Sequence, residues 1–381
     1  MDPFRDDDHA ALIRAAHLEE ENERLRRELE EARKPKPRAK PPTKRPQPVA
    51  IIMAAGLGLG GAAVATFLGL HASPTPVTPF ERKMLEVPAP VPVPTKALPA
   101  APDWAESTSI PSVDLLAYAQ GNVPAVGYAV GKGGAIFRHY AVEGSAWTVE
   151  ASGTTRDLYS VGEMLGVVCA VGAKGIAVCS RDPAKVAWKA EPTGTHQDLL
   201  GAHGFGELTA VGRNGTIVYR DEQGSWSTEA SGTKADLFAV TSRVGAAYAV
   251  GAGGVIVRSD GGAPKWTLVA SGTTEDLFGV AVEAEEVVVV GAHGTILRLT
   301  DPRAGFRRES SGTTSDLYGV AHGDRGYDFI AVGANGTILR SVASGWEPET
   351  GGGSHTLRAV LGSIPTMFIV GDGGTVLHRP Y

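Results

Sequence analysis

The sequence predicts an all-β protein whose main part is a seven-bladed β-propeller, preceded by an α-helical coiled coil and one transmembrane helix. Three observations carry this prediction: a repeat near forty residues, a short heptad pattern, and an uncharged apolar run of 22 residues. The predicted parts are 1–34 (coiled coil), 35–48 (basic Pro-rich linker), 49–71 (transmembrane helix), 72–103 (Pro-rich extended linker) and 104–381 (propeller).

The repeat is clearest in the segments "SGTKADLFAV", "SGTTEDLFGV" and "SGTTSDLYGV". Its aspartates are Asp114, Asp157, Asp198, Asp236, Asp276 and Asp316, and Thr356 takes the seventh place. The steps between these positions are 43, 41, 38, 40, 40 and 40 residues. A period of this size is typical of propellers and solenoids.

Each repeat predicts four short strands. The first follows the aspartate, as in "DLFGVAV". The second and third are apolar runs joined by Asn-Gly, Gly-Gly or His-Gly, a pattern typical of tight β-hairpins. The fourth carries an aromatic residue, as in "KWTLVAS". Four strands in forty residues indicate a propeller blade.

The aromatic residues predict how the ring closes. Each of the following lies ten residues before the next aspartate position: Trp147, Trp188, Trp226, Trp266, Phe306 and Trp346. The last repeat ends after its third strand, whereas Trp104 lies ten residues before Asp114. We therefore expect the segment around Trp104 to supply the outer strand of blade seven, which removes free sheet edges.

Two repeated polar positions are open to a structural and a functional interpretation. The aspartates and the Ser/Thr of "SGTTxD" are good acceptors for backbone N–H groups in turns, but six carboxylates on one face are also a candidate cation site. The third strands end in Arg138, Arg258, Arg298 and Arg340, with His378 in the same register. A bond to a neighbouring blade is the favoured role for these basic residues, and ligand binding is the alternative.

These blades resemble the photosystem II stability and assembly factor-like propellers, within the wider WD-repeat and BNR/sialidase-like group. The resemblance rests on "SGTTxDLxxV", "AVGxxGxIxR" and the tryptophans, and covers roughly residues 104–381. It implies the fold, but no catalytic residue, because this architecture hosts many activities.

The N-terminal segment predicts a parallel two-stranded coiled coil. Residues 11, 15, 18, 22, 25, 29 and 32 form a heptad seam that includes Leu18, Asn22, Leu25 and Leu29. Asn22 falls at an a position, where a buried polar residue favours two strands. A single charged, solvated helix is the alternative. Glycines with small-xxx-small spacing in 49–71 also favour helix pairing, so we expect a homodimer.

The apolar run is long enough to cross a bilayer. Seven Lys or Arg and no acid lie in residues 33–48, so the N-terminus is expected in the cytoplasm and the propeller outside it, in the periplasm if the membrane is a bacterial inner membrane. A cleaved signal peptide is the alternative, which the 48 preceding residues disfavour.

Two cysteines, Cys169 and Cys179, face each other across the hairpin "CAVGAKGIAVC". An oxidising compartment permits a disulfide there, but cross-strand geometry is often poor, so bonded and free states both remain open.

Function is predicted less sharply. Residues 104–381 carry 21 Lys or Arg and 28 Asp or Glu, which disfavours nucleic acid. No catalytic, metal or cofactor motif stands out. We expect a non-enzymatic scaffold or assembly module for a protein or glycan partner, with the loops in "YAQGNVPAVGY" and "AHGDRGYDFI" as first contact candidates. The alternative is a glycan-active hydrolase that uses one propeller face.

Overall fold

The computed structural model describes residues 104–107, 110, 112–121, 126–140, 146–181, 187–205, 207–243, 246–260, 266–323, 328–363 and 366–380. The predicted coiled coil, both linkers and the apolar run 49–71 lie outside these residues. Within the described part of the chain, no helix is long and apolar enough to span a membrane.

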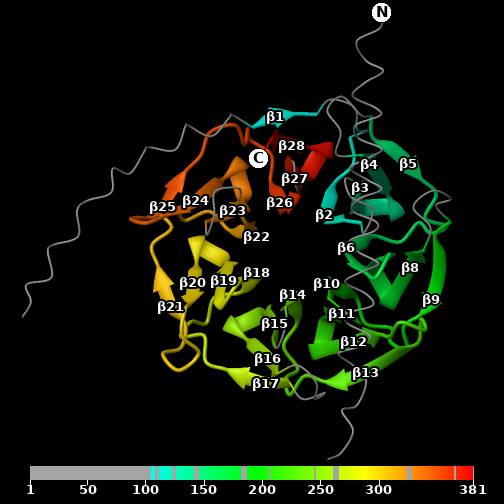
Figure 1. Cartoon of the computed structure of the whole chain (residues 1–381), viewed down its shortest axis with the longest axis horizontal. Coiled ribbons are helices and arrows are strands. Elements are labelled where there is room, and N and C mark those ends of the chain that lie inside the picture. Colours follow the sequence, from blue (N-terminus) through cyan, green and yellow to red (C-terminus); the bar gives the residue numbers. More distant parts are fainter. Residues whose placement is uncertain are drawn as a thin grey trace, which may run out of the picture. The chain divides into compact units, whose positions relative to one another are not determined.

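The described residues form seven four-stranded antiparallel sheets arranged around a centre (Figure 1). Six sheets take four consecutive strands each. The seventh combines the last three strands with β1 from the start of the described chain, where Ala105 pairs with His378 and Glu106 with Leu377. The predicted closure of a seven-bladed propeller by the N-terminal segment is therefore confirmed.

The first three blades have the following strands. Blade one holds β2 (Leu115–Gln120), β3 (Val126–Gly131), β4 (Ile136–Tyr140) and β5 (Thr148–Glu150). Blade two holds β6 (Leu158–Met164), β7 (Val167–Gly172), β8 (Ile176–Ser180) and β9 (Lys189–Pro192). Blade three holds β10 (Leu199–Phe205), β11 (Glu207–Gly212), β12 (Thr216–Arg220) and β13 (Trp226–Ala230).

The other four blades continue the same order. Blade four holds β14 (Leu237–Arg243), β15 (Ala246–Gly251), β16 (Ile256–Asp260) and β17 (Trp266–Val269). Blade five holds β18 (Leu277–Glu283), β19 (Glu286–Gly291), β20 (Ile296–Leu299) and β21 (Arg307–Glu309). Blade six holds β22 (Leu317–His322), β23 (Phe329–Gly333), β24 (Ile338–Val342) and β25 (Gly345–Pro348). Blade seven holds β26 (Leu357–Ser363), β27 (Thr366–Gly371), β28 (Val376–Pro380) and β1 (Ala105–Glu106).

A single 3₁₀ turn joins the second and third strands of every blade. These turns are η1 (Lys132–Gly134), η2 (Ala173–Gly175), η3 (Arg213–Gly215), η4 (Ala252–Gly254), η5 (Ala292–Gly294), η6 (Ala334–Gly336) and η7 (Asp372–Gly374). In η4 the last two residues have φ of 64° and 76°, which favours glycine. A Cβ on Gly254 would also lie 2.1 Å from the carbonyl oxygen of Thr273, so the turn packs tightly on the following loop.

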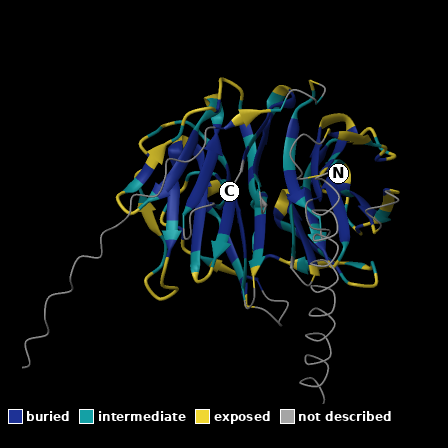
Figure 2. Cartoon of the chain, turned by 45° about the horizontal axis from the view of Figure 1, so that its top comes forward, coloured by how far each residue is buried: buried dark blue, intermediate teal, exposed yellow. Residues whose placement is uncertain are grey.

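The core lies between neighbouring sheets, because the middle strands are buried on both faces (Figure 2). In β19 the four consecutive residues Val287–Val290 are at most 2% exposed. This explains the nearly continuous apolar runs, which differ from the alternating pattern of a sheet with one face in water. The exposed residues gather at the strand ends, in the loops and on the outermost strands.

Candidate binding site at the channel mouth

The innermost strand of each blade carries a β-bulge at the same place. The register shifts by one residue after the first residue of every such strand, for example between Leu237 and Ala239 in β14. A bulge takes one residue out of the ladder and re-aims its side chain. The bulged residues, which we call the mouth ring, are Leu116, Tyr159, Leu200, Phe238, Phe278, Tyr318 and Arg358.

The mouth ring opens into a central channel. All seven ring residues are half-buried and line a cavity of about 400 Å³. The next residue in each innermost strand is small: Ala117, Ser160, Gly201, Ala239, Gly279, Gly319 and Ala359. At Gly201, Gly279 and Gly319 the neighbouring blade requires this small size, because a Cβ there would lie 2.8 to 3.0 Å from a backbone carbonyl oxygen of that blade.

Three blades give the mouth ring a continuous aromatic arc. The ring centroids of Phe238 and Phe278 are 5.6 Å apart, and those of Phe278 and Tyr318 are 5.3 Å apart, both in tilted arrangements. The guanidinium of Arg358 lies over Tyr318, 4.8 Å from its centroid. The same guanidinium donates two hydrogen bonds of 2.8 Å to the carboxylate of Asp372 in η7.

The repeated aspartates lie around the mouth ring and join neighbouring blades. Each accepts a hydrogen bond of 2.7 to 2.9 Å through Oδ1 from the backbone N–H of the middle residue of the preceding blade's 3₁₀ turn. One of these bonds, from Gly373 to Asp114, closes the circle between blades seven and one. Where Thr356 replaces the aspartate, the Gly336 N–H donates to the carbonyl of His355 instead.

Serines and threonines of the "SGTT" segments stabilise the loops that bring these aspartates into place. In the loop before blade five, the Ser271 hydroxyl donates to the carbonyl of Thr273 and accepts the N–H of the same residue. The Thr273 hydroxyl oxygen accepts the N–H of Glu275. Such local bonds hold a turn without using the strand ladders.

The surface bearing these loops and the 3₁₀ turns, which we call the joint face, has two different halves. In the half formed by blades one to three, the turns carry Lys132, Lys174 and Arg213. Lys132 binds Asp114 at 2.5 Å, and Arg213 binds Asp236 at 2.6 Å. We call this the basic half.

These contacts stabilise the charged form of the two carboxylates. The hydrogen bond from Lys132 is the main cause that lowers the pKa of Asp114, and the N–H of Gly373 adds to it. The pKa of Asp236 is lowered first by the N–H of Asn214 and further by Arg213.

In the other half the carboxylates beside the aromatic arc are not matched in this way. Within the described residues, no Lys or Arg forms an ion pair with Asp276 or Asp316. The imidazole of His293 points to Glu275, with Nδ1 2.8 Å from its carboxylate. We call the surface of Phe238, Phe278 and Tyr318 with these two aspartates the aromatic half.

The far end of the channel contains a half-buried polar contact. The Nδ1 atom of His203 accepts the N–H of Ser242 at 3.2 Å and lies 3.0 Å from its hydroxyl oxygen. Burial lowers the pKa of His203 to about 4, so the imidazole is neutral at pH 7. Glu163 is the only carboxylate among the described residues that line the channel.

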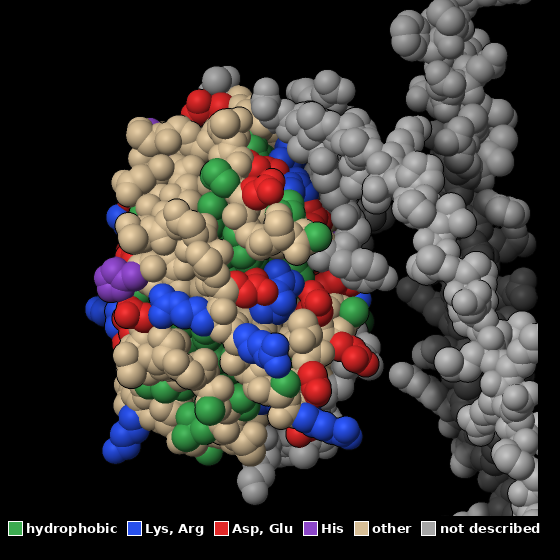
Figure 3. All heavy atoms as spheres, turned by 90° about the vertical axis from the view of Figure 1, so that its left-hand side faces the viewer, with side chains coloured by type: hydrophobic (Ala, Val, Ile, Leu, Met, Phe, Trp, Pro, Cys, Tyr) green, Lys and Arg blue, Asp and Glu red, His purple; other side chains and the backbone are tan. Residues whose placement is uncertain are grey.

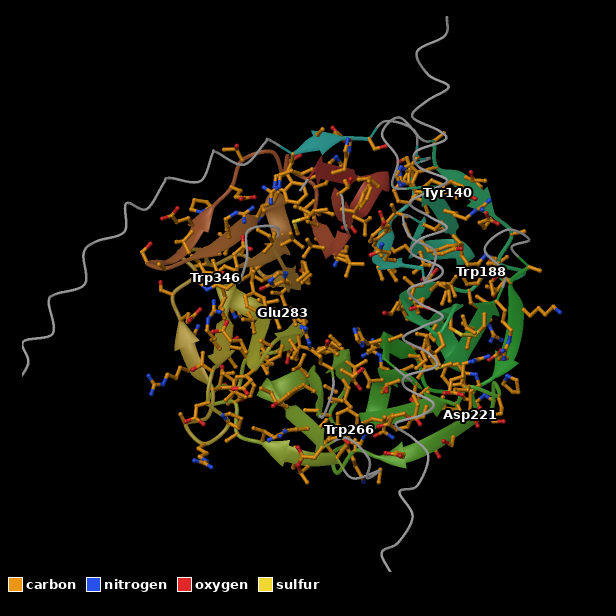
Figure 4. All side chains as sticks on the ribbon, viewed as in Figure 1. Tyr140, Trp188, Asp221, Trp266, Glu283 and Trp346 are labelled. Atoms are coloured by element: carbon orange, nitrogen blue, oxygen red, sulfur yellow. A yellow bond between two sulfur atoms is a disulfide. The ribbon has the colours of Figure 1, made fainter. Side chains whose placement is uncertain are left out.

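The predicted tryptophans form a second joint near the outer ends of the blades, where Trp188, Trp266 and Trp346 are seen in Figure 4. Trp346 packs in the core between blades five and six, and its indole N–H donates to Glu309 of blade five at 2.7 Å. Trp104 repeats this contact with Glu349 of blade six at 2.9 Å. Trp226 does so with Glu191 of blade two, also at 2.9 Å.

The arginines at the third position of the third strands, which the sequence places at the strand ends, complete this outer joint. Arg138, Arg298 and Arg340 bind Glu150, Glu309 and Glu349, the glutamates of their own blades. These three arginines therefore bond within their own blades, where the sequence suggests a neighbouring one. Two arginines one position further along the third strand, Arg220 and Arg379, do bind the glutamate of the preceding blade. Burial raises the pKa of Glu349, but Arg340, Trp104 and Arg379 outweigh it and hold this pKa below its usual value.

Sequence reasoning overlooked the glutamate of this joint, although a signal for it exists. A glutamate follows the aromatic residue by three positions in five blades: Glu150, Glu191, Glu229, Glu309 and Glu349. Blade four has Val269 in this place, and the facing aromatic residue of blade five is Phe306, which has no N–H to donate. Between blades four and five, both the glutamate acceptor and the tryptophan N–H donor are therefore replaced by apolar residues.

Cys169 and Cys179 form a disulfide between β7 and β8. With Glu191 they are also the only three His, Cys, Asp or Glu side chains, among the described residues, whose ligand atoms all lie within 4.8 Å of one another. The repeated aspartates do not converge in this way.

The coiled-coil positions Leu18, Asn22, Leu25 and Leu29 lie outside the described residues.

The loops first considered for partner contact follow the ends of β2 and β22, which lie at the opposite end of the blades from the joint face. Their tips, 122–125 and 324–327, lie outside the described residues. The outer surface visible in Figure 3 mixes acidic and basic side chains with scattered apolar ones, without one extended apolar patch. Of three cavities lined by described residues, the one at the mouth ring is the most enclosed.

The sequence matches no protein-family profile and no curated protein. Solved propellers match the fold. "YCF48 from Cyanidioschyzon merolae" has 16% identity and a TM-score of 0.60, covering 73% of this chain and 99% of that one. "YCF48 bound to D1 peptide" has 16% identity and a TM-score of 0.61, covering 75% and 99%.

A WD-repeat propeller is similar to the same extent. The "WD40 beta propeller domain of Doa1" has 12% identity and a TM-score of 0.62, covering 74% of this chain and 97% of that one. The propeller of this chain is thus a seven-bladed ring that matches the YCF48 and WD40 propellers in structure.

Proposed function

We propose that this propeller is a non-enzymatic binding module that holds a segment of a partner protein on its joint face, at the mouth ring. The observation that carries the proposal is the ring itself. Seven equivalent bulges aim seven side chains at one cavity, and these side chains differ from blade to blade. The aspartates two residues earlier are nearly constant. Binding sites in symmetric scaffolds require such differences between repeats, because a partner segment has no sevenfold symmetry.

A similar propeller supports this choice of partner, since one of the matched structures is described as bound to a peptide. Hydrolysis of glycans is less well supported. Most glycosidases need a pair of carboxyl groups on either side of the scissile bond, and the described channel lining offers Glu163 alone.

We also propose that the apolar run 49–71 anchors the propeller outside the cytoplasm and that the heptad seam in 1–34 pairs two chains. Support comes from the sequence: the basic residues on one side of the run, its length, and Asn22 in the seam. Protease added to spheroplasts is expected to remove the propeller, whereas protection until the inner membrane is lysed would contradict this topology.

Position-specific photocrosslinking in intact cells tests the binding surface. A photoreactive amino acid replaces Leu116 or Leu200 in the mouth ring, Leu165 at the opposite end, or Thr228 on the exposed outer strand of blade three. We expect a discrete protein adduct from the two ring positions and none from the other two. Adducts confined to Leu165 or Thr228 would reject the mouth ring as the site.

A further inference from the structure

The aromatic half and the basic half of the joint face offer different chemistry to a ligand. Around the basic half, Lys132 and Arg213 already neutralise carboxylates. In the aromatic half, Asp276 and Asp316 stand two residues before Phe278 and Tyr318, and each has an Oδ2 with no cationic partner among the described residues. Aromatic faces with nearby carboxylates attract cations, through the ring quadrupole and through charge.

The propeller itself contains one contact between a cation and an aromatic face of the mouth ring. At the seventh position of the mouth ring, the guanidinium of Arg358 lies 4.8 Å from the centroid of Tyr318. Its charge is matched by two bonds to Asp372. At this level of the channel, a guanidinium thus packs on one aromatic face and pairs with one carboxylate. Phe238 and Phe278 continue the arc with no such group over them among the described residues.

We propose that the aromatic half binds a cationic side chain, an arginine or a lysine presented by an extended segment of the partner protein. This inference rests on the proposed function and names the ligand chemistry of the same site. The aliphatic part of the side chain packs on Phe238 and Phe278, and its charged end faces Asp276 and Asp316. The cavity of about 400 Å³ that Phe238 and Phe278 line gives this side chain room.

Alternative occupants fit less well. A carboxylate would meet Asp276 and Asp316, and the nearby Arg358 is already matched by Asp372. A purely apolar side chain would fill the arc but would desolvate these two charges without replacing their hydration, which costs free energy. Residues 104–381 carry 28 Asp or Glu and 21 Lys or Arg, and this net negative charge also favours a cationic ligand.

Two capped peptides that differ in one charge provide the test. The full chain in detergent micelles is titrated with acetylated and amidated Gly-Ser-Gly-Arg-Gly-Ser-Gly carrying a fluorophore, and with the same peptide in which citrulline replaces arginine. Citrulline keeps the shape and most hydrogen-bond donors of arginine but is neutral. We expect the arginine peptide to bind about fivefold to thirtyfold more tightly, as measured by fluorescence anisotropy.

Variants localise the effect. Asp276→Asn combined with Asp316→Asn removes both charges while leaving a side-chain oxygen to accept the N–H groups of Gly253 and His293. This pair is expected to abolish the preference for arginine. The matched control, Asp157→Asn with Asp198→Asn, makes the same change at the equivalent joints before blades two and three, and is expected to keep the preference within about twofold.

Phe278→Leu places in the arc the residue type that Leu116 and Leu200 supply elsewhere in the mouth ring, and is expected to reduce the preference severalfold. Equal binding of the two peptides, or equal losses in the test and control pairs, would overturn the inference. The crosslinks at Leu116 and Leu200 are scored separately. Their persistence without an arginine preference would reject the cationic ligand and leave the proposed function standing, and their absence would reject the proposed function.

Discussion

The aspartate and the bulged residue of each blade are separated by a single leucine, yet they behave in opposite ways around the ring. The aspartate occurs in six of seven blades and makes the same bond to the preceding turn each time. The bulged residue is aliphatic, aromatic or cationic according to the blade. Constant positions hold the ring together, and variable positions that face one cavity are available for recognition.

The leucine between them belongs with the constant positions. It is Leu115, Leu158, Leu199, Leu237, Leu277, Leu317 and Leu357 in the seven blades, and it is fully buried in each. Of three consecutive residues, the aspartate thus bonds to the preceding blade, the leucine packs in the core, and the bulged residue lines the channel. The bulge makes this possible, because it turns the third side chain toward the channel without shifting the rest of the strand.

The largest effect is expected from opening the ring. Deleting residues 100–110 removes β1 and Trp104, which is 7% exposed and packs between blades six and seven. Loss of a buried tryptophan alone costs about 3–5 kcal/mol, and the deletion also leaves β28 as a free edge. Thermal unfolding followed by circular dichroism should show a much lower midpoint than deletion of 73–95. Equal midpoints for the two truncations would rule out closure by this segment.

The next largest effect is a difference in stability loss between substitutions at two adjacent residues of blade five, Leu277 and Phe278. Leu277→Ala creates a cavity at a fully buried site and is expected to lower the free energy of unfolding by about 2–5 kcal/mol. Phe278→Leu changes a half-buried side chain of the channel and should alter it by less than about 1 kcal/mol. Urea unfolding of both variants checks the difference. A Phe278→Leu loss as large as that of Leu277→Ala would place the mouth ring among the structural positions.

The smallest effect concerns His203, whose side chain lines the channel and contacts Ser242. Its pKa is about 4 when folded, below the ordinary value of 6.5. The unfolded chain therefore binds the proton first, and stability falls as pH decreases from about 6.5 to about 4. We expect this to remove about 1–3 kcal/mol in the wild type. His203→Gln, which keeps an acceptor for Ser242, should lose less over the same range.

Urea unfolding at pH 7.5, 6 and 5 measures this comparison between His203→Gln and the wild type. Parallel curves for the two proteins across the three pH values would show that His203 does not titrate differently on folding. The stability assigned to its neutral form would then have to come from another group.

The sequence was sufficient for the fold because its strongest signals are local and repeated. The forty-residue period, the hairpin sequences and the displaced Trp104 together predict seven blades and their closure. The mouth ring was not predicted, because a bulge depends on strand register, which "DLFGVAV" does not encode by its pattern alone. The outer joint was predicted in part. Its tryptophans are visible as single residues, but the glutamates that accept the N–H groups of Trp104, Trp226 and Trp346 belong to the preceding blade, so these pairs become evident only once the blades are adjacent.

The way Trp104 is held has a mechanical consequence. Everything that precedes it in the chain is attached to the ring through this residue, so a pull on the N-terminal side is applied to blade seven at its outer edge. The two-residue ladder between β1 and β28 would resist such a pull poorly by itself. The indole packs between blades six and seven, donates a hydrogen bond to Glu349 and lies 4.1 Å from the guanidinium of Arg379. These contacts distribute the force over both sheets.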